Sequence, residues 1–260
     1  MQINGVFIED TFAEAFSMKA TRLTVTAINE KWAREAAEAA TGFSTSVIGC
    51  GVEAGIEGKS PYTLDGRPGI DCLFFASGKT DLIKNVTNRV GQAIMTTPTS
   101  ACYDGVLAEI PSDFEGLKKY EIGKSLRFFG DGFQASKVIG GVRYWRIPVM
   151  EGEFLIQEEF TMTKAIGGGN FLILAKTVED GLAAAEAAVA AMSSLRGIVM
   201  PFPGGVVRSG SKVGSKYKFL TASTNTAYCP TICSMVADSE VRGKDTASVM
   251  ELVIDGLTEE

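Results

Sequence analysis

The chain has 260 residues, of which 45% are hydrophobic and 22% are charged, so it has enough apolar sequence for a folded core and is not of the disordered class. Its formal net charge of −6 argues against nucleic acid as the main partner, because phosphate binding needs a basic surface. The sequence contains no histidine, which excludes a Ser-His-Asp triad, a Cys-His pair and a histidine-ligated zinc. Acid–base chemistry therefore depends on Asp, Glu, Lys, Tyr or Cys.

The sequence also predicts a cytoplasmic location. No apolar run reaches the roughly 18 residues that a membrane span needs, and residues 1–5 do not begin a signal peptide. The five cysteines are an odd number without a CxxC pair, which is typical of a reduced protein rather than a disulfide framework.

Two strand–helix–strand units are predicted within the first hundred residues. In the first unit, residues 21–27 form a strand, Asn29 caps a helix that ends before Gly42, and residues 45–48 form the second strand. In the second unit, residues 70–76 form a strand, Thr80 caps a helix, and residues 93–97 form the second strand. Runs of β-branched and apolar residues predict the strands, and apolar residues at helical spacing predict the helices.

Two further units are predicted after residue 170. Residues 171–174 form a buried strand, Thr177 and Asp180 form a capping box at the start of a helix, and residues 198–200 form the next strand. The fourth unit begins with a strand over residues 249–254. Thr258 then has the character of an N-cap, with Glu259 and Glu260 in the first helical turn.

Four units in two pairs predict an α/β (α+β) fold made of two ferredoxin-like split β-α-β lobes. We assign residues 1–150 to the first lobe and residues 151–260 to the second. A mainly β segment joins them, with strands over residues 145–149 and 153–162. The second lobe lacks its last helix and strand, and an uncovered sheet edge is costly. We therefore expect that the chain is truncated or that something else covers the gap.

Two glycine-rich segments fail as nucleotide-binding motifs. Gly58-Lys59-Ser60 resembles the end of a phosphate-binding loop, but the glycine required five positions earlier is Glu53, whose carboxylate would repel a phosphate. The three glycines at residues 167–169 lead into a strand, so no helix N-terminus follows to hold a pyrophosphate. Backbone geometry explains both segments better.

The turn-rich segment that begins at Pro201 is a stronger candidate for a ligand site. Rigid prolines and glycines precede hydroxyl groups and cations, namely Arg208, Ser209, Ser211, Lys212, Ser215, Lys216 and Lys218. Such loops suit an anionic ligand, and the polar stretch continues through Ser223 and Asn225. A solvated basic loop on an acidic protein is the alternative, and it has about equal weight.

Glu251 is the carboxylate that the pattern singles out. The alternation of residues 249–254 places it on the same strand face as Val249 and Val253. Poor solvation between two valines would favour its protonated form and suit it for proton transfer. The alternative is that this face is open to water and that Glu251 only adds solubility. The acidic cluster within residues 9–14 is likewise either a solvated face or part of a site.

Short motifs spread over the whole chain carry a resemblance to a known family. Two of them are Asp65-Gly66-Arg67-Pro68-Gly69 and Gly168-Gly169-Asn170-Phe171, and the others occupy residues 4–6, 10–16, 40–43, 53–56, 128–132, 151–154, 184–188, 201–205 and 210–212. In this order they resemble the formylmethanofuran:tetrahydromethanopterin formyltransferase family over essentially all of the chain. Family members carry a further helix and strand after the position of Glu260, so the resemblance also predicts a truncated second lobe.

The resemblance implies a cytoplasmic homotetramer with two ferredoxin-like lobes. It implies an acyltransferase of one-carbon metabolism and methanogenesis that moves a formyl group between the amine of methanofuran and N5 of tetrahydromethanopterin. Both carriers are anionic substrates, and no metal or tightly bound cofactor is expected because the formyl oxidation level does not change. Glu251 matches the family's proposed acid–base residue. We expect the carriers to be bound by Gly168, Asn170, Arg208, Ser209, Ser211, Lys212, Lys216, Ser223 and Asn225.

Two alternatives stay open at the level of the sequence. The first is a non-catalytic, scaffold-type subunit of a formyltransferase/hydrolase complex, which an incomplete second lobe favours and an intact Glu251 opposes. The second is a formyltransferase that uses a related furan carrier, such as a methylofuran. A measurement of carrier preference would distinguish this second alternative from a methanofuran-dependent enzyme, because no motif in the sequence indicates the carrier.

Overall fold

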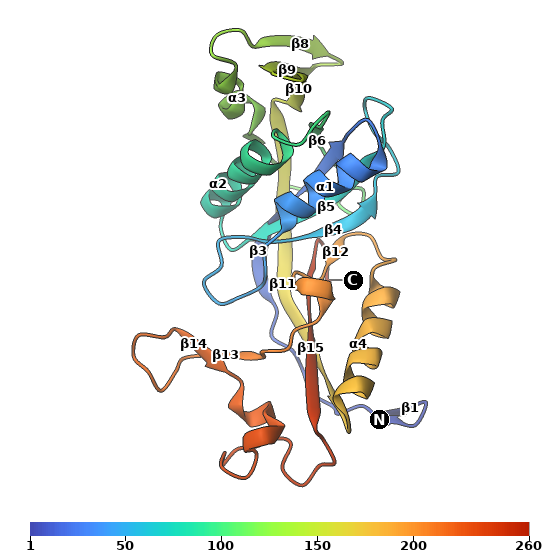
Figure 1. Ribbon diagram of the computed structural model, residues 1–260, viewed down its shortest axis with the longest axis vertical. Coiled ribbons are helices and arrows are strands. Elements are labelled where there is room, and N and C mark those ends of the chain that lie inside the picture. The colour runs from blue at the N-terminus through green and yellow to red at the C-terminus, as the bar shows by residue number, and fades with distance from the viewer. Residues whose placement is uncertain (260) are drawn as a thin grey trace.

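The computed structural model describes residues 1–259 and shows an elongated molecule whose two lobes are joined by two long strands (Figure 1). Strands β3 (Phe16–Thr26) and β11 (Glu159–Ala175) pair antiparallel where the lobes meet, from Met162 opposite Thr21 to Gly167 opposite Phe16. The second half of β11 then continues into the second lobe. The two lobes are therefore joined by hydrogen-bonded strands and not by a flexible linker.

The first lobe has the predicted split β-α-β order. It contains β3, α1 (Glu30–Thr41), β4 (Glu53–Lys59), β5 (Gly69–Ala76), α2 (Lys79–Arg89) and β6 (Ala101–Asp104), and the antiparallel sheet order is β4-β5-β3-β6. Asn29 caps α1 as predicted, because its Oδ1 accepts the Trp32 N–H at 3.1 Å. Leu23 and Val25 of β3 are fully buried in one core with the apolar faces of both helices.

The second lobe is a smaller version of the same plan. Its antiparallel sheet has the order β12-β15-β11, with β12 (Ile198–Val199) and β15 (Ser248–Gly256), and α4 (Val178–Met192) packs against it. Thr177 caps α4 as predicted, its Oγ1 accepting the Asp180 N–H at 3.0 Å. By analogy with the first lobe, a fourth strand would lie beside β11 and a second helix beside α4. Neither is present within residues 1–259, and Phe171 on β11 is 41% exposed.

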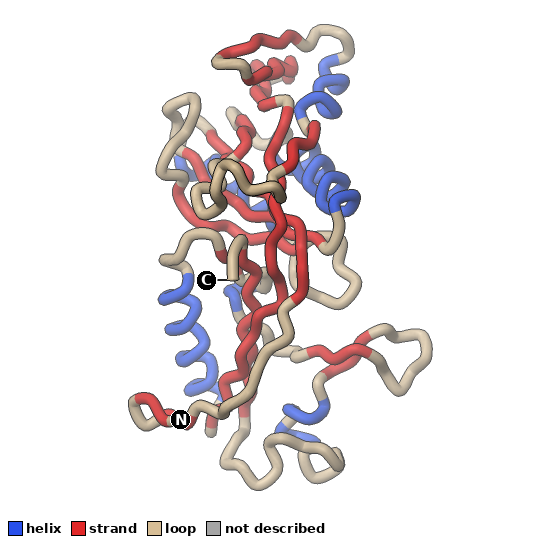
Figure 2. The backbone as a smooth tube through the Cα atoms, turned by 180° about the vertical axis from the view of Figure 1, so that it is seen from behind, coloured by secondary structure: helices blue, strands red, loops and turns tan. Residues whose placement is uncertain are grey.

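Residues 118–157 build the far end of the first lobe (Figure 2). They form β7 (Lys118–Glu121), α3 (Gly123–Leu126), β8 (Ala135–Ile139), β9 (Val142–Val149) and β10 (Gly152–Gln157). Strand β10 pairs antiparallel with β9 and parallel with β6, so the sheet of the first lobe continues beyond residue 150. The division of the chain at residue 150 stays a prediction. No helix among the described residues is long and apolar enough to cross a membrane.

Two short hairpins complete the described strands. Strands β1 (Gln2–Ile3) and β2 (Val6–Phe7) pair near the N-terminus. Strands β13 (Ser211–Val213) and β14 (Ala222–Thr224) pair within the long loop that precedes β15.

Two predicted strands are wrong. Residues 45–48 form a loop in which Val47 and Ile48 are 52% and 42% exposed, because β4 takes the place beside β5. Residues 93 and 94 belong to the π-helical turn Val90–Ile94 at the end of the second helix, and residues 95–97 form the turn that follows it. The Met95 N–H donates to the Val90 carbonyl oxygen at 2.8 Å. Val90 and Ile94 are fully buried, so this apolar run extends the stripe of α2 instead of starting a strand.

Two predicted helix starts also differ from the structure. The N-cap of α2 is Gly78 and not Thr80, and no side chain caps that helix. Leu257, Thr258 and Glu259 are not helical, because the Leu257 N–H pairs with the Gly197 carbonyl oxygen as an extension of the sheet. Glu260 lies outside the described residues.

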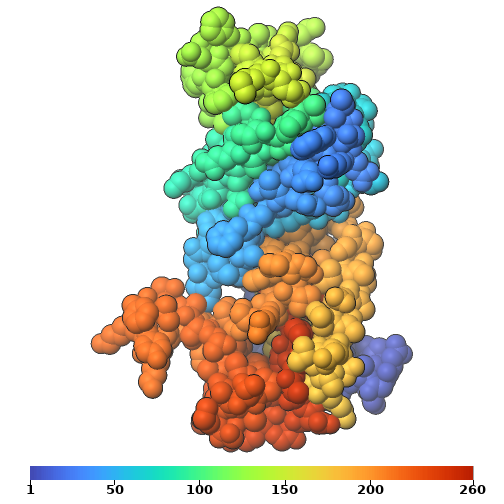
Figure 3. Space-filling view, in the orientation of Figure 1, coloured from blue at the N-terminus to red at the C-terminus, as the bar shows by residue number. Residues whose placement is uncertain are grey.

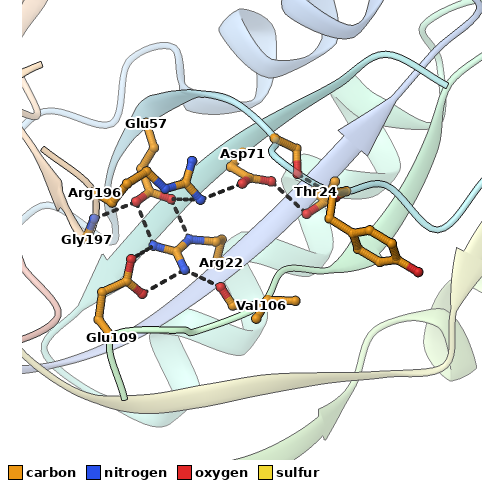
Figure 4. A network of polar contacts seen from close by, with 10 residues as sticks. Arg22, Thr24, Glu57, Asp71, Val106, Glu109, Arg196 and Gly197 are labelled. Carbon is orange, nitrogen blue, oxygen red and sulfur yellow. Dashed lines mark hydrogen bonds and ion pairs between the residues drawn. The ribbon is translucent and has the colours of Figure 1, made fainter. Parts of the chain in front are cut away.

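A buried network of ion pairs fixes one lobe against the other (Figure 4). Arg22 on β3 is 1% exposed, and its Nη2 donates to Glu57 Oε1 at 2.7 Å and to Glu109 Oε1 at 2.9 Å. From the second lobe, the Gly197 N–H donates to the same Glu57 oxygen at 2.7 Å, and Arg196 Nη2 donates to Asp71 Oδ2 at 2.7 Å. Glu57 thus accepts hydrogen bonds from both lobes.

The charges of this network compensate one another. Burial alone would lower the pKa of Arg22, but hydrogen bonds and charges from Glu57 and Glu109 raise it above its usual range. Burial alone would raise the pKa of Glu109, but its hydrogen bond with Arg22 lowers it overall. The arginine and Glu109 therefore stay ionised inside the junction.

Candidate active site

A hollow of about 950 Å³ opens between the N-terminal arm, the first lobe and β15. Its lining comes from residues 13–16, the loop of residues 46–50, Glu53 on β4, Gly168 and Asn170 on β11, and Glu251 on β15. Both lobes therefore contribute to it. We call it the junction hollow.

A second hollow of about 1000 Å³ lies against the long loop that precedes β15. Residues 206–210, Asn225, residues 228–231 and residues 247–251 line it, and we call it the loop hollow. Among the described lining residues, Glu251 is the one that both hollows share. Transfer of a group between two bound molecules needs their reacting atoms to meet at one point, and Glu251 stands where the two hollows meet.

Glu251 is held by neighbours on both sides of β15. It lies opposite Leu172 of β11, and on its other side it exchanges backbone hydrogen bonds of 2.7 and 3.0 Å with Val207. Its side chain is half-buried, and Oε1 accepts a hydrogen bond from Asn170 Nδ2 at 2.7 Å. The predicted strand is confirmed as part of β15, and Val253 of the predicted face lines the junction hollow together with Glu251. One carboxylate oxygen is thus oriented by an amide, in a group that can accept and donate a proton.

Comparison with known proteins identifies the family. The family model of formylmethanofuran-tetrahydromethanopterin formyltransferase matches residues 1–149, and the model of its proximal lobe matches residues 152–260. The chain belongs to this family.

Individual members of the formyltransferase family match the whole chain. A curated relative from Methylobacillus flagellatus, named formylmethanofuran–tetrahydromethanopterin formyltransferase, is 56% identical over 100% of this chain and 84% of its own length. The solved formyltransferase from Methanosarcina barkeri has a TM-score of 0.89 and 43% identity, covering 99% of this chain and 85% of that chain. The solved formyltransferase/hydrolase complex from Methylorubrum extorquens, with methylofuran, gives a TM-score of 0.92 and 46% identity, covering 100% of this chain and 83% of that chain.

These matches confirm three expectations from the sequence: the family resemblance, the two-lobed α/β fold, and the formyltransferase class of enzyme.

Six of the nine predicted binding residues line one of the two hollows. Gly168, Asn170 and Ser211 line the junction hollow, and Arg208, Ser209 and Asn225 line the loop hollow. The structure thereby divides the predicted set between two adjoining sites.

The other three predicted residues lie on the hairpin β13–β14, which stands away from the body of the protein (Figure 3). Lys212, Lys216 and Ser223 line neither hollow among the described residues. Lys212 Nζ donates to Thr226 Oγ1 at 2.7 Å, and Ser223 Oγ donates to the Gly214 carbonyl oxygen at 2.8 Å.

Sequence reasoning missed a group of acids and a thiol at the junction hollow. Glu53 is 4% exposed and Asp255 is fully buried. Cys50 Sγ donates to Glu53 Oε1 at 3.4 Å, and burial together with the charge of Glu53 raises the pKa of the Cys50 thiol to about 12. Asp255 had a detectable signal, because the alternation that selected Glu251 reaches it two positions after Val253. Glu14, from the N-terminal acidic cluster, also lines this hollow.

Gly168 is held in place by its own backbone contacts. Its N–H donates to Asp255 Oδ1 at 3.1 Å, so this amide is already engaged within the protein. Its φ of +78° belongs to the left-handed region that favours glycine. Gly168 therefore shapes the wall of the junction hollow through its backbone.

Proposed function

We propose that this chain transfers a formyl group between the amine of a formylated furan carrier, methanofuran or a methylofuran, and N5 of tetrahydromethanopterin. The observation that carries this proposal is the position of Glu251, which is shared by two hollows of comparable size. One hollow for each carrier would bring the two amines to the same carboxyl group. The names of the family and of its solved members support this choice of carriers.

The reaction needs a carbon–nitrogen bond to form and another to break, with one proton moved between the amines. N5 of the pterin attacks the formyl carbon, and a tetrahedral adduct with a negatively charged oxygen forms. Glu251 takes the proton that N5 gives up and returns a proton to the amine of the furan carrier as its bond to the formyl carbon breaks. Asn170 engages Oε1 of Glu251, and we assign Oε2 to the proton transfer.

The decisive experiment measures formyl transfer through the absorbance of the formyl-pterin product. In Glu251→Gln, kcat should fall by about 10² to 10⁴-fold, because the amide keeps the hydrogen bond to Asn170 but cannot carry the proton. Glu186→Gln on the exposed face of α4 is the matched control and should leave kcat unchanged. Near wild-type activity of Glu251→Gln would remove Glu251 from the mechanism.

A second candidate role is that of a component of a formyltransferase/hydrolase complex. It is favoured by the 46% identity to a chain of the solved Methylorubrum extorquens complex. A curated relative from the same organism, whose name makes it one of the subunits of such a complex, is 47% identical to this chain. The wild-type assay separates a catalytic from a non-catalytic component. A well-folded chain that transfers no formyl group under any condition would favour the scaffold role.

We also propose a cytoplasmic homo-oligomer, with a homotetramer as the expected state. All five cysteines are free thiols, which supports a reducing compartment. Exposed apolar side chains gather near the far end of the first lobe and support an interface there, namely Phe128, Phe129, Phe133, Val138, Ile139 and Met150. Light scattering after gel filtration measures the assembly directly, and a monomer at micromolar concentration would contradict it.

A further inference from the structure

Two carboxyl groups are buried together behind the junction hollow without a cation. Glu53 on β4 is 4% exposed and Asp255 on β15 is fully buried. The two strands approach each other here, because Val199 of β12 pairs with Asp255 and a Cβ on Gly55 of β4 would lie 2.8 Å from the Val199 side chain. Each keeps one buried oxygen, Glu53 Oε2 and Asp255 Oδ2, to which no other group donates. Within residues 1–259 neither forms an ion pair. Because ionised carboxylates only accept hydrogen bonds, a bond between them requires a proton on one of them.

The Asp255 side chain of this pair is hydrogen-bonded to a β-bulge in β11. The pairing of β11 with β15 shifts in register between Ile166 and Gly169, and within that shift the Gly168 N–H donates to Asp255 Oδ1 at 3.1 Å. The space around the bulge is fully used. A Cβ on Gly167 would lie 2.8 Å from Asp255 Oδ1, and one on Gly168 would lie 2.2 Å from the Phe16 ring. The carboxyl pair and the glycine bulge therefore fit each other as one unit.

The bulge decides where the next side chain of β11 points. Asn170 follows two residues after Gly168 and donates to Glu251 Oε1 at 2.7 Å. A shift of one residue along a strand turns each side chain to the opposite face of the sheet. Loss of the bulge would therefore turn Asn170 away from Glu251 and leave the carboxyl group without its orienting amide.

We propose that Glu53 and Asp255 share one proton and act as a positioning pair, which fixes the glycine bulge and so aims Asn170 and Glu251 at the carriers. The inference rests on the proposed formyl transfer and adds two residues to it that do not touch the reacting atoms.

The surroundings of the pair support a shared proton. Burial, with the charge of Glu53, raises the pKa of Asp255 well above its usual range. The titratable groups near the pair are the Cys50 thiol, which donates to Glu53, and the acids Glu14 and Glu251, which line the same hollow as Glu53. The neighbouring strands contribute uncharged groups, including Gly167 of β11 and Val199 of β12. None of these groups is a cation that could neutralise the pair in place of a proton.

Steady-state formyl transfer by three variants tests the positioning role. In Asp255→Asn, the amide oxygen can accept the Gly168 N–H and the amide nitrogen can donate a hydrogen bond to Glu53, so kcat should stay within about threefold of wild type. For the same reason, kcat of Glu53→Gln should stay within about threefold of wild type. Asp255→Ala loses both contacts, and kcat should fall by about 10- to 100-fold, while KM for either carrier changes much less. Rescue by the amide separates positioning from a direct chemical role. The idea fails if Asp255→Asn is as inactive as Asp255→Ala, or if Asp255→Ala keeps wild-type kcat.

A second readout needs neither the carriers nor the alanine variant. The infrared spectrum of the wild-type chain near neutral pH should contain the carbonyl band of a buried protonated carboxyl group, and both Asp255→Asn and Glu53→Gln should lack it. Absence of that band from the wild type would overturn proton sharing even if the enzyme is active. An inactive wild type that shows the band would instead contradict only the proposed transfer.

Discussion

Strand β4 carries two buried carboxyl groups, Glu53 and Glu57, four residues apart and in opposite electrical surroundings. Glu57 accepts from Arg22 and from the Gly197 N–H, each at 2.7 Å, and lies 3.8 Å from Arg196. Glu53 instead meets a neutral thiol and the carboxyl group of Asp255. The difference teaches that one strand uses buried acids for two purposes. A compensated charge holds the lobes together, and an uncompensated pair shapes the site.

The largest expected effect comes from breaking the compensated region. Arg22→Met leaves Glu57 fully buried without its main cation, so the free energy of unfolding should fall by about 3–5 kcal/mol. Urea unfolding followed by circular dichroism measures this change. Arg34→Met, which breaks the exposed pair with Glu38 on α1, is the control and should cost less than about 0.5 kcal/mol. Equal losses in the two variants would mean that burial does not strengthen the junction network.

A matched pair of substitutions on β4 sharpens the comparison. Glu57→Gln removes charge-assisted hydrogen bonds to Arg22 and should lower the free energy of unfolding by about 1.5–3 kcal/mol. Glu53→Gln replaces the shared proton with an amide N–H that can donate to Asp255, so its effect should lie within about 1 kcal/mol of zero. Both variants replace a carboxyl group with an amide on the same strand, and the same urea experiment compares their free energies of unfolding. The reverse order would contradict the assignment of the two surroundings.

Local patterns predicted β15, which carries Asp255, but neither β4, which carries Glu53 and Glu57, nor the partners of these acids. Alternation in residues 249–254 located β15 and singled out Glu251, and the capping residues Asn29 and Thr177 were confirmed. The hydrogen bonds around these acids join distant segments of the chain, since Gly197 and Glu57 are 140 residues apart and Gly168 and Asp255 are 87 residues apart. Side-chain periodicity contains no information on such distances.

The errors have a similar cause. Short apolar runs are ambiguous between strand and helix, and at residues 93–97 the burial of Ile94 against the first-lobe core favoured the helix. The basic loop after Pro201 was recognised by composition, but composition did not show that Arg208 lines a hollow while Lys212 lies on a projecting hairpin. Tertiary placement decided both cases.

The pH dependence of stability tests the uncompensated pair. An unfolded Asp titrates at about 3.9, whereas burial raises the pKa of Asp255 in the folded chain, so folding favours its protonated form. The contribution of Asp255 to the free energy of unfolding is fully present below pH 4. It declines as the pH rises toward the pKa of Asp255 in the folded chain, by at most about 1.4 kcal/mol per pH unit. Asp255→Asn removes the titration, so its stability relative to wild type should increase with pH above 4. A constant difference between the two across pH 4–8 would contradict the raised pKa.

The smallest expected effect belongs to charges that are neither buried nor inside a hollow. Lys212 is exposed on β13 and makes one hydrogen bond, to Thr226, so it can attract an anionic carrier only through solvent. Lys212→Ala should raise KM for a carrier by about two- to fivefold with little change in kcat, and the effect should shrink as salt is added. Lys79→Ala at the start of α2 is the control, since it lines neither hollow and should leave both constants unchanged. A fall in kcat that exceeds the rise in KM would place Lys212 at the reacting groups, and the hairpin would then have to close over the junction hollow during turnover.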